Sequence, residues 1–539
     1  MLKLVSAQQT EVITQLRRFT PLVLQLIFKK KMKMKNIFKL GLFALLFTVG
    51  ACNDATDIIQ ESELDETAAF QTVADLNSGL NGVYSAYSPD AGSNGNGDAI
   101  FFNDLFTDNI KKGLVSSGQG SSEYSFILQP STSTPESIWA NRYGTINRAN
   151  RVLRAFERIY PTLPAGDVAA TNEDQFAADK IKGQLLAIRA LCHLDLFEYF
   201  TPDYANAAGL SVIKMDFVPE VTDTFERNTV SEIVAFINDD MDQAATLLDG
   251  FTVGAAFNSW HYMSVNAVKA MQARLALDTE NYVLAETIAT DLMSTGSLAD
   301  AAAYQDMFTD TAQGEIIFSL ARNPNTGDNG IAGNWYANRV RRTGSPVLEA
   351  SKQLYNLFDD ADVRKAVTFV AVGDPEGSAP NAPAPAYNGI ILIGKYPGAA
   401  ADFLVNDVKI FRYSEIQLIL AEAQARNNNL AGAASSIAAL RTKRNDPTAT
   451  PAYASVNAAL TDVLLERRKE LAFEGHRYLD LKRLGGELGI GISRLASDAA
   501  TFAAPTDLAA NDYRFTLPIP QSELNANSII TQNPGYPVN

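Results

Sequence analysis

Apolar residues recur at spacings of three and four along most of the chain, and this period limits it to an architecture built from helices. Two long amphipathic helices are predicted over Ile138–Tyr160 and Lys180–Phe200. Strand patterns are few and short, as at Glu315–Leu320 and Ile390–Ile393. We therefore expect a mostly α-helical fold with few short strands. Further helices are predicted over Val230–Leu248, Ser264–Asp278, Tyr282–Ser294, Tyr413–Arg426, Ala431–Lys443 and Val456–Arg483.

Two stretches, Ala270–Leu292 and Leu418–Leu440, share a pattern of small residues, a short turn and a second helix. This pattern resembles the tetratricopeptide helix-turn-helix, in which small residues let two antiparallel helices approach closely. The period is not maintained along the chain, so chance similarity between two alanine-rich helix pairs is the alternative. We favour a unit that is used twice.

Long segments rich in Gly, Asn and Pro separate some of the predicted helices. They are Ser88–Asp98, Asn323–Gly333 and Gly373–Gly389. Loops of this length within a compact body are usually functional or disordered. Composition does not shift abruptly enough anywhere to mark an independent domain boundary.

The balance of charge argues against a nucleic-acid partner. The 539 residues contain 61 acidic and 45 basic side chains, which gives a formal net charge of −16. Binding to a phosphate backbone depends on clustered Lys and Arg, and no contiguous cluster occurs outside the extreme N-terminus. We therefore expect no nucleic-acid binding.

Cysteine and histidine are scarce, which bounds the redox and metal chemistry. With only Cys52 and Cys192, a disulfide framework is excluded, and Cys192 is expected to be a buried thiol in an apolar helix. His193, His261 and His476 are far apart in sequence and lack an HExxH or CxxC partner. We expect each histidine to be structural and predict no metal site and no cofactor.

Residues 32–51 have the pattern of a secretory signal. A lysine-bearing start at Met32 is followed by an apolar run, Leu40–Val49, and by small residues before Cys52. The run is shorter than the ~20 residues that a membrane-spanning helix needs, so a retained span is not expected. Residues 1–31 lie before this signal and do not themselves have the pattern of a secretory signal. We expect them to be a spurious upstream extension.

The segment Val49–Cys52 resembles a bacterial lipobox, whose cysteine is acylated and becomes the first residue of the mature protein. Two or more acyl chains suffice for stable membrane anchoring. The alternative is that Cys52 merely ends an ordinary cleavage site. Residues 52–66 are polar and acidic, which suits a flexible tether between a lipid anchor and a folded body.

Glu466, Glu470 and Glu474 recur every four residues on one predicted helix, with arginines close by in the sequence. Carboxylates in such an array are candidates for general acid/base work. A column of carboxylates among arginines is, however, typical of ion pairs that join helices. We expect ion pairs, and we expect the sequence Glu474 to Arg477 to form a bend.

An ordered set of segments resembles the SusD/RagB family and covers nearly all of the chain after the signal. The resemblance predicts a SusD-like domain over residues 67–539, with an N-terminal part at 67–270 and a C-terminal RagB/SusD part at 271–539. The segments are Phe70–Tyr87, Gly183–Phe200, Arg412–Asn428, Ile437–Asp446, Leu464–Gly485 and Phe515–Tyr536.

The resemblance implies about four tetratricopeptide-like helix pairs that support an irregular, loop-rich ligand-binding half. It also implies a non-enzymatic lipoprotein, anchored at the cell surface of a Gram-negative outer membrane. Such a protein forms a lid on a SusC-like TonB-dependent transporter and delivers captured oligosaccharides to it. No catalytic residues are expected, because no nucleophile elbow, phosphate loop or metal motif stands out.

Two other functions are considered beside glycan capture. A RagB-type lid would capture peptides through a wider cavity with fewer aromatic platforms. A surface glycoside hydrolase would need two opposed carboxylates about 5–10 Å apart in a cleft.

The candidate ligand-binding residues are Trp335 and Tyr336, with Asn334 and Arg339 as polar helpers. They follow a glycine-rich stretch outside the segments that build the scaffold. Sugar rings stack their apolar faces on Trp and Tyr, while their hydroxyls pair with amide and guanidinium groups. Core packing of Trp335 is the alternative.

Overall fold

The computed structural model describes residues 66–90, 99–113, 116, 118, 120–161, 173–254, 258–322, 331, 347–371, 391–397, 405–499 and 503–537. Residues Glu66–Asn539 form one compact unit. Within the described part of the chain, no helix is long and apolar enough to cross a membrane. Cys52, the predicted signal and the predicted tether up to Asp65 lie outside the described residues.

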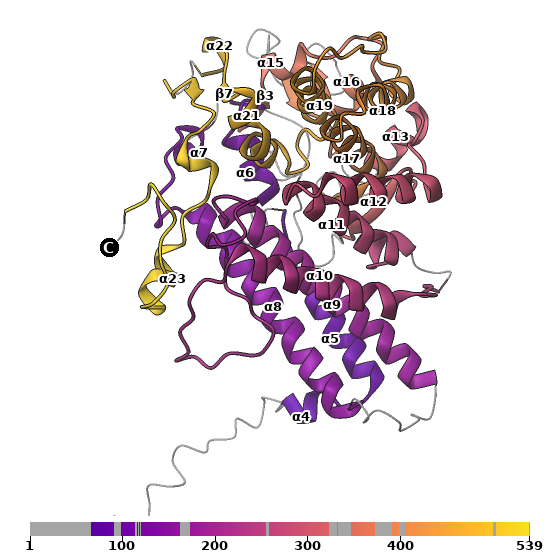
Figure 1. The fold of residues 1–539 in the computed structure, drawn as a ribbon, viewed down its shortest axis with the longest axis vertical. Helices are drawn as coiled ribbons and strands as arrows, with labels where there is room; N and C mark the ends of the chain where they lie inside the picture. The colour runs from indigo at the N-terminus through magenta and orange to yellow at the C-terminus, as the bar shows by residue number, and fades with distance from the viewer. Residues whose placement is uncertain are drawn as a thin grey trace, which may run out of the picture. The chain divides into compact units, whose positions relative to one another are not determined.

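Helices dominate the described residues, as predicted (Figure 1). The α-helices are α4 (Glu66–Ala69), α5 (Val73–Ala86), α6 (Ala99–Leu105), α7 (Ser121–Tyr124), α8 (Ser133–Ile159), α9 (Glu173–Phe200), α10 (Val230–Leu248), α11 (Val265–Asp278), α12 (Tyr282–Thr295), α13 (Ala301–Phe308), α15 (Lys352–Tyr355), α16 (Val363–Thr368), α17 (Tyr413–Arg426), α18 (Leu430–Lys443), α19 (Val456–Glu470), α20 (Arg477–Asp480), α21 (Gly486–Leu488), α22 (Ala496–Ala499) and α23 (Gln521–Ala526). Shorter helical turns are η1 (Ser259–His261), η4 (Leu481–Gly485) and η6 (Tyr513–Phe515).

The long helices pack in a row that follows the chain, in which each helix contacts the next. The row runs α8, α9, α10, α11, α12, α17 and α18, with α5 against α8 and α9 and with α19 against α17. The step from α12 to α17 is the exception to sequence order, because residues 296–412 intervene. This row is the tetratricopeptide-like scaffold that the sequence predicts.

The pairs α11–α12 and α17–α18 have the same backbone geometry at their turns. Each pair joins two helices of 14 residues. The turns contain a residue with positive φ, Glu280 (60°) or Asn428 (62°), followed by an asparagine N-cap, Asn281 or Asn429. Asparagine suits this position because its side chain accepts a hydrogen bond from the free N–H groups of the second helix. The predicted repeated unit is confirmed.

Strands occur in two-stranded antiparallel pairs that join distant parts of the chain. The pair β2–β6 aligns Ile316 with Arg412 and Leu320 with Val408. The prediction of strands near 315–320 and 390–393 is therefore confirmed at β2 and β5. The strands are β1 (Ile110–Lys112), β2 (Ile316–Leu320), β3 (Leu348–Ala350), β4 (Phe369–Ala371), β5 (Ile391–Ile393), β6 (Val408–Arg412), β7 (Ile492–Ser493) and β8 (Asp507–Leu508), paired β1–β3, β2–β6, β4–β5 and β7–β8.

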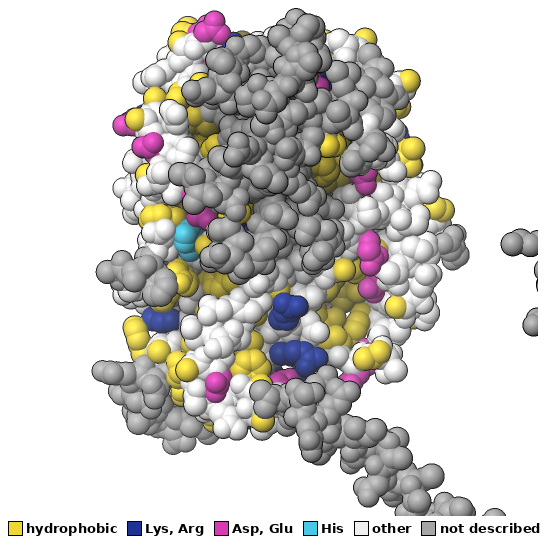
Figure 2. All heavy atoms as spheres, turned by 180° about the vertical axis from the view of Figure 1, so that it is seen from behind, with side chains coloured by type: hydrophobic (Ala, Val, Ile, Leu, Met, Phe, Trp, Pro, Cys, Tyr) yellow, Lys and Arg dark blue, Asp and Glu magenta, His cyan; other side chains and the backbone are white. Residues whose placement is uncertain are grey.

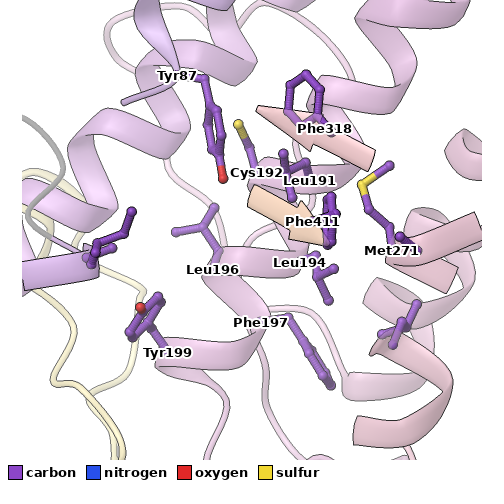
Figure 3. Packing of buried hydrophobic residues seen from close by; sticks show 14 of the residues in the cluster. Tyr87, Leu191, Cys192, Leu194, Leu196, Phe197, Tyr199, Met271, Phe318 and Phe411 are labelled. Atoms are coloured by element: carbon purple, nitrogen blue, oxygen red, sulfur yellow. The ribbon is translucent and has the colours of Figure 1, made fainter. Parts of the chain in front are cut away.

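The largest apolar core surrounds α9, which is buried on most sides (Figure 3). Phe318 of β2, Phe411 of β6 and Met271 of α11 gather beside this helix. Cys192 is a free, fully buried thiol in the same core, as predicted, and burial raises its pKa above the ordinary value. Helix α9 therefore connects the helical scaffold to the strand pair β2–β6.

His193 is a structural residue within the scaffold. Its Nδ1–H donates to the carbonyl of Arg189 at 2.9 Å, and its Nε2 accepts from the N–H of Met215 at 3.2 Å. Burial lowers the pKa of His193 to about 3, so the ring is neutral at physiological pH. No group of three or more metal-ligating side chains is found among the residues described above.

The single helix predicted over Val456–Arg483 is wrong, because α19 ends at Glu470. Phe473 and Gly475 have φ values of 65° and 90°, which no helix accommodates. The carbonyl of Glu470 accepts from Lys395 at 2.8 Å instead of continuing the helix. The N–H of Phe473 donates to Asp104 at 3.3 Å. The predicted bend is real, and buried polar partners from other segments hold it.

The predicted ion pairs of Glu466, Glu470 and Glu474 are confirmed, and all three carboxylates are buried. Each one binds at least two cations, which come from other segments of the chain. The pairs are Glu466 with Arg364 (2.5 Å) and Arg441 (2.8 Å), Glu470 with Arg364 (3.3 Å), Arg412 (3.0 Å) and Arg444 (3.0 Å), and Glu474 with Lys395 (2.5 Å) and Arg412 (2.7 Å). This glutamate column ties α19 and the bend after it to the segments between α12 and α17 and to the end of α18.

The arginines beside the column in sequence have other partners. Arg467 pairs with Asp480 at 2.6 Å. Arg468 and Arg477 both pair with Asp108, at 3.2 Å and 2.9 Å. The two pairs with Asp108 hold the segment after α6 against the end of α19 and the start of α20.

Candidate ligand-binding site

The predicted site residues Asn334, Trp335, Tyr336 and Arg339 lie outside the described residues. They belong to the segment 332–346, and their role as ligand contacts stays a prediction. The described residues on either side of it define where the segment begins and ends.

The described chain reaches Arg322, shortly after β2. Apart from Ile331, it resumes at Val347, just before β3. Strand β2 is held by β6, and Arg322 stands two residues after it. Strand β3 pairs with β1, aligning Leu348 with Lys112. The described residues on both sides of this part of the chain are therefore attached to buried strands.

A buried ion pair joins Arg322 to Asp90. Arg322 Nε donates to Asp90 Oδ2 at 2.9 Å, and Nη2 donates to Oδ1 at 2.5 Å. Burial alone would raise the pKa of Asp90, but the Arg322 guanidinium outweighs it and lowers this pKa. Asp90 precedes the Gly/Asn-rich residues 91–98, so this bidentate pair brings the beginnings of two predicted functional loops together.

Asp407 and His261 lie next to the ion pair of Arg322 and Asp90. The N–H of Arg322 donates to Asp407 Oδ1 at 3.0 Å, and His261 Nε2 lies 2.8 Å from Asp407 Oδ2. Burial raises the pKa of Asp407, but the contacts with His261 and Lys409 prevail and lower it. Both side chains keep an exposed fraction, 18% for His261 and 17% for Asp407.

Trp260 adds an aromatic surface beside His261, with ring centroids 5.7 Å apart. It stands in the turn η1 and is partly buried against the cluster that includes Tyr304 and Phe308. We call the five residues Asp90, Trp260, His261, Arg322 and Asp407 the Arg322 cluster. It combines an indole, an imidazole, a guanidinium and two carboxylates at the start of the loops.

This chemistry suits a neutral polar ligand with apolar faces. The partly exposed imidazole and carboxylate offer a donor and an acceptor, and the indole offers a stacking surface. A glycosidic general acid needs a raised carboxyl pKa, whereas the pKa values of Asp90 and Asp407 are both lowered. Neither carboxyl of the cluster therefore has the raised pKa that a general acid needs.

The described residues also line cavities elsewhere. A partly open cavity of about 70 Å³ lies among charged side chains such as Arg142, Asp195 and Arg467. Ligand sites usually measure about 300–1,000 Å³, so this cavity is too small for an oligosaccharide.

Sequence reasoning missed the Arg322 cluster. His261 was expected to be structural, and Trp260 was not considered. The two residues come shortly before Ser264, the N-cap of α11. The sequence did contain one usable signal for the cluster, because Asp90 and Arg322 border the long Gly/Asn-rich segments. Their pairing across the chain was not visible in the sequence.

Residues 315–536 match the model of the SusD family, and residues 57–277 match the model described as starch-binding associating with outer membrane. The chain belongs to the SusD family.

Individual relatives agree with this assignment. SusD-like protein P2 of Formosa agariphila is 23% identical over 93% of this chain and 99% of its own length. A putative sugar binding protein from Bacteroides vulgatus superposes with a TM-score of 0.69 at 24% identity, covering 87% of this chain and 100% of its own. A laminarin binding SusD-like protein gives a TM-score of 0.64 at 20% identity, with 87% and 100% covered.

Proposed function

We propose that this protein is a cell-surface lipoprotein that captures oligosaccharides and delivers them to a SusC-like TonB-dependent transporter without catalysing a reaction. The Arg322 cluster carries the proposal, because one buried ion pair gathers two loop roots beside an indole and a partly exposed imidazole. Relatives named for binding sugar or laminarin support the choice of a glycan.

In this proposal the cluster forms the floor of the site. Trp260, Trp335 and Tyr336 stack on sugar rings, while His261, Asn334 and Arg339 bind hydroxyl groups. Stacking surfaces serve many sugars, so the loops select among glycans by their shape.

Calorimetry against a panel of purified oligosaccharides tests the proposal. We expect one or more glycans to bind, and we expect His261→Ala to weaken that binding about fivefold, since a hydrogen bond contributes about 1 kcal/mol. Lys352→Ala, at an exposed lysine of α15, is the control and should bind as the parent does. Binding of oligopeptides with no response to glycans would establish the peptide-capturing function instead, and release of shorter sugars would establish a hydrolase.

Anchoring is tested at Cys52. Cys52→Ser is expected to abolish fatty-acid incorporation and to release the protein from the membrane or leave it unprocessed, because the acyl chains supply the anchor. Metabolic labelling with a fatty acid and membrane fractionation measure both effects. A variant that still incorporated label and stayed on the outer membrane would contradict acylation at this residue.

The transporter partner is tested with the parent protein. Gentle detergent extraction should recover it together with a large TonB-dependent barrel. Recovery only as a free monomer, under conditions that preserve other such complexes, would contradict the partnership.

A further inference from the structure

Four exposed arginines follow one side of α8: Arg148, Arg151, Arg154 and Arg158. Spacings of three and four place them on one helix face, over a length of about 15 Å. We call this set the α8 arginine stripe. Figure 2 shows Lys and Arg side chains gathered in the lower half of that view, at the level where α4 and α5 lie in Figure 1.

The stripe is positively charged, although the chain as a whole has a net charge of −16. Arg151 and Arg154 share a single carboxylate, that of Glu66. Arg158 donates to a backbone carbonyl, that of Phe70, and Arg148 forms no ion pair with any described residue. Glu220 also acts on the charge of Arg154, whereas Arg148 and Arg158 have no carboxylate partner among the described residues, so the stripe keeps a net positive charge.

Exposed apolar side chains stand next to the stripe. A groove of about 470 Å³ is lined by Arg154 of the stripe and by Phe217, whose exposed fraction is 46%. Val221, farther along the same loop, is fully exposed. The loop is fixed at its base, because Asn150 donates to the Phe217 carbonyl at 2.7 Å and the Phe217 ring packs edge-on against Phe225.

The stripe also lies where the described chain begins. Glu66, the first described residue, is bound by two of the four arginines. Fully extended, the 14 steps between residues 52 and 66 span at most about 50 Å. A lipid on Cys52 would thus keep the stripe within about 50 Å of a membrane surface, where a weak attraction acts at high local concentration.

We propose that the α8 arginine stripe, together with Phe217 and Val221, binds the phosphate-bearing headgroups of the membrane and sets the orientation of the scaffold on it. Basic groups beside exposed apolar side chains are the combination that peripheral proteins use on anionic membranes. The proposal rests on the proposed function only for the anchor at Cys52.

Flotation with lipid vesicles tests this binding without the anchor. The chain from residue 53 onward contains the whole compact unit Glu66–Asn539 and has no acylation site. It is expected to bind vesicles of phosphatidylcholine with phosphatidylglycerol, and not vesicles of phosphatidylcholine alone. About 1 M NaCl should abolish the binding, since the Debye length is then only about 3 Å.

The double variant Arg148→Gln/Arg151→Gln should bind about 25-fold more weakly, at about fivefold per charge near an anionic surface. The matched control Lys352→Gln/Lys443→Gln removes two exposed charges from α15 and α18 and should bind as the parent does. Equal loss in both variants, or equal binding to both kinds of vesicle, would overturn the proposal. Glycan affinity should be unchanged in both variants, so a failure of glycan capture is detected separately.

Discussion

Glu470→Gln is expected to lower the free energy of unfolding by about 3–5 kcal/mol, the cost of leaving buried charges without their partner. Glu470 is fully buried and pairs with Arg412 and Arg444, each at 3.0 Å, and with Arg364 at 3.3 Å. Glutamine keeps the size of the side chain but removes its charge. Urea unfolding followed by circular dichroism measures the difference.

The same column predicts how stability depends on pH. Burial raises the pKa of Glu470, but Arg444, Arg412 and Arg364 outweigh it and hold this pKa well below 4.5. A depressed carboxyl pKa contributes stability that is present above about pH 4.5 and is lost as the pH falls further. The Glu470→Gln variant should therefore lose less stability than the parent below pH 4.5.

A matched control is Asp291→Asn, which breaks the exposed pair with Lys269 at 2.6 Å. Exposed pairs contribute about 0–1 kcal/mol, so its unfolding should change little. If Glu470→Gln proved as mild as Asp291→Asn, the buried network would not stabilise the fold in the way described.

Trp335→Ala is expected to weaken glycan binding by roughly 1–3 kcal/mol while leaving the melting temperature nearly unchanged. This result follows if Trp335 stacks on the sugar, as proposed, and takes no part in core packing. Calorimetric titration and thermal unfolding of the same variant measure both quantities.

Trp139→Ala provides the reference for a core tryptophan. Trp139 is 4% exposed in α8, and its indole N–H donates to Glu523 at 3.1 Å. Its loss should cost about 3–5 kcal/mol of stability. A comparable loss for Trp335→Ala would assign that residue to the core and remove it from the ligand site.

The scaffold was predictable because it depends on local signals. Helices α10 and α17 have the same bounds as predicted, since the apolar period is clear in both, and Thr229 and Glu232 also form a capping box at the start of α10. The bend at Glu474 to Arg477 was predicted, but the end of α19 at Glu470 was not, because its causes lie elsewhere in the chain, in Lys395 and Asp104. A helical period continues through the bend, and only tertiary partners reveal that the backbone leaves it.

The candidate site was less accessible to prediction for the same reason. Composition identified the loops, and an aromatic pair suggested Trp335 and Tyr336. The Arg322 cluster depends on contacts between residues far apart, such as Asp90 with Arg322, that no local pattern encodes. The sequence thus predicted which segments carry function, and it could not predict where their described ends meet.

The contact between α12 and α17 also bears on how such a protein diversifies. Gly296 follows α12, and a Cβ there would lie 1.8 Å from the ring of Tyr413, the first residue of α17. The chain therefore departs from the helical row and rejoins it at nearly one place. Lengthening a closed excursion costs little free energy, because each doubling of a loop adds only about 0.6 kcal/mol. Lengthening between the buried residues of 297–412 is thus open to evolution, while Gly296, Tyr413 and the buried partners of the glutamate column, Arg364, Lys395 and Arg412, are not open to exchange.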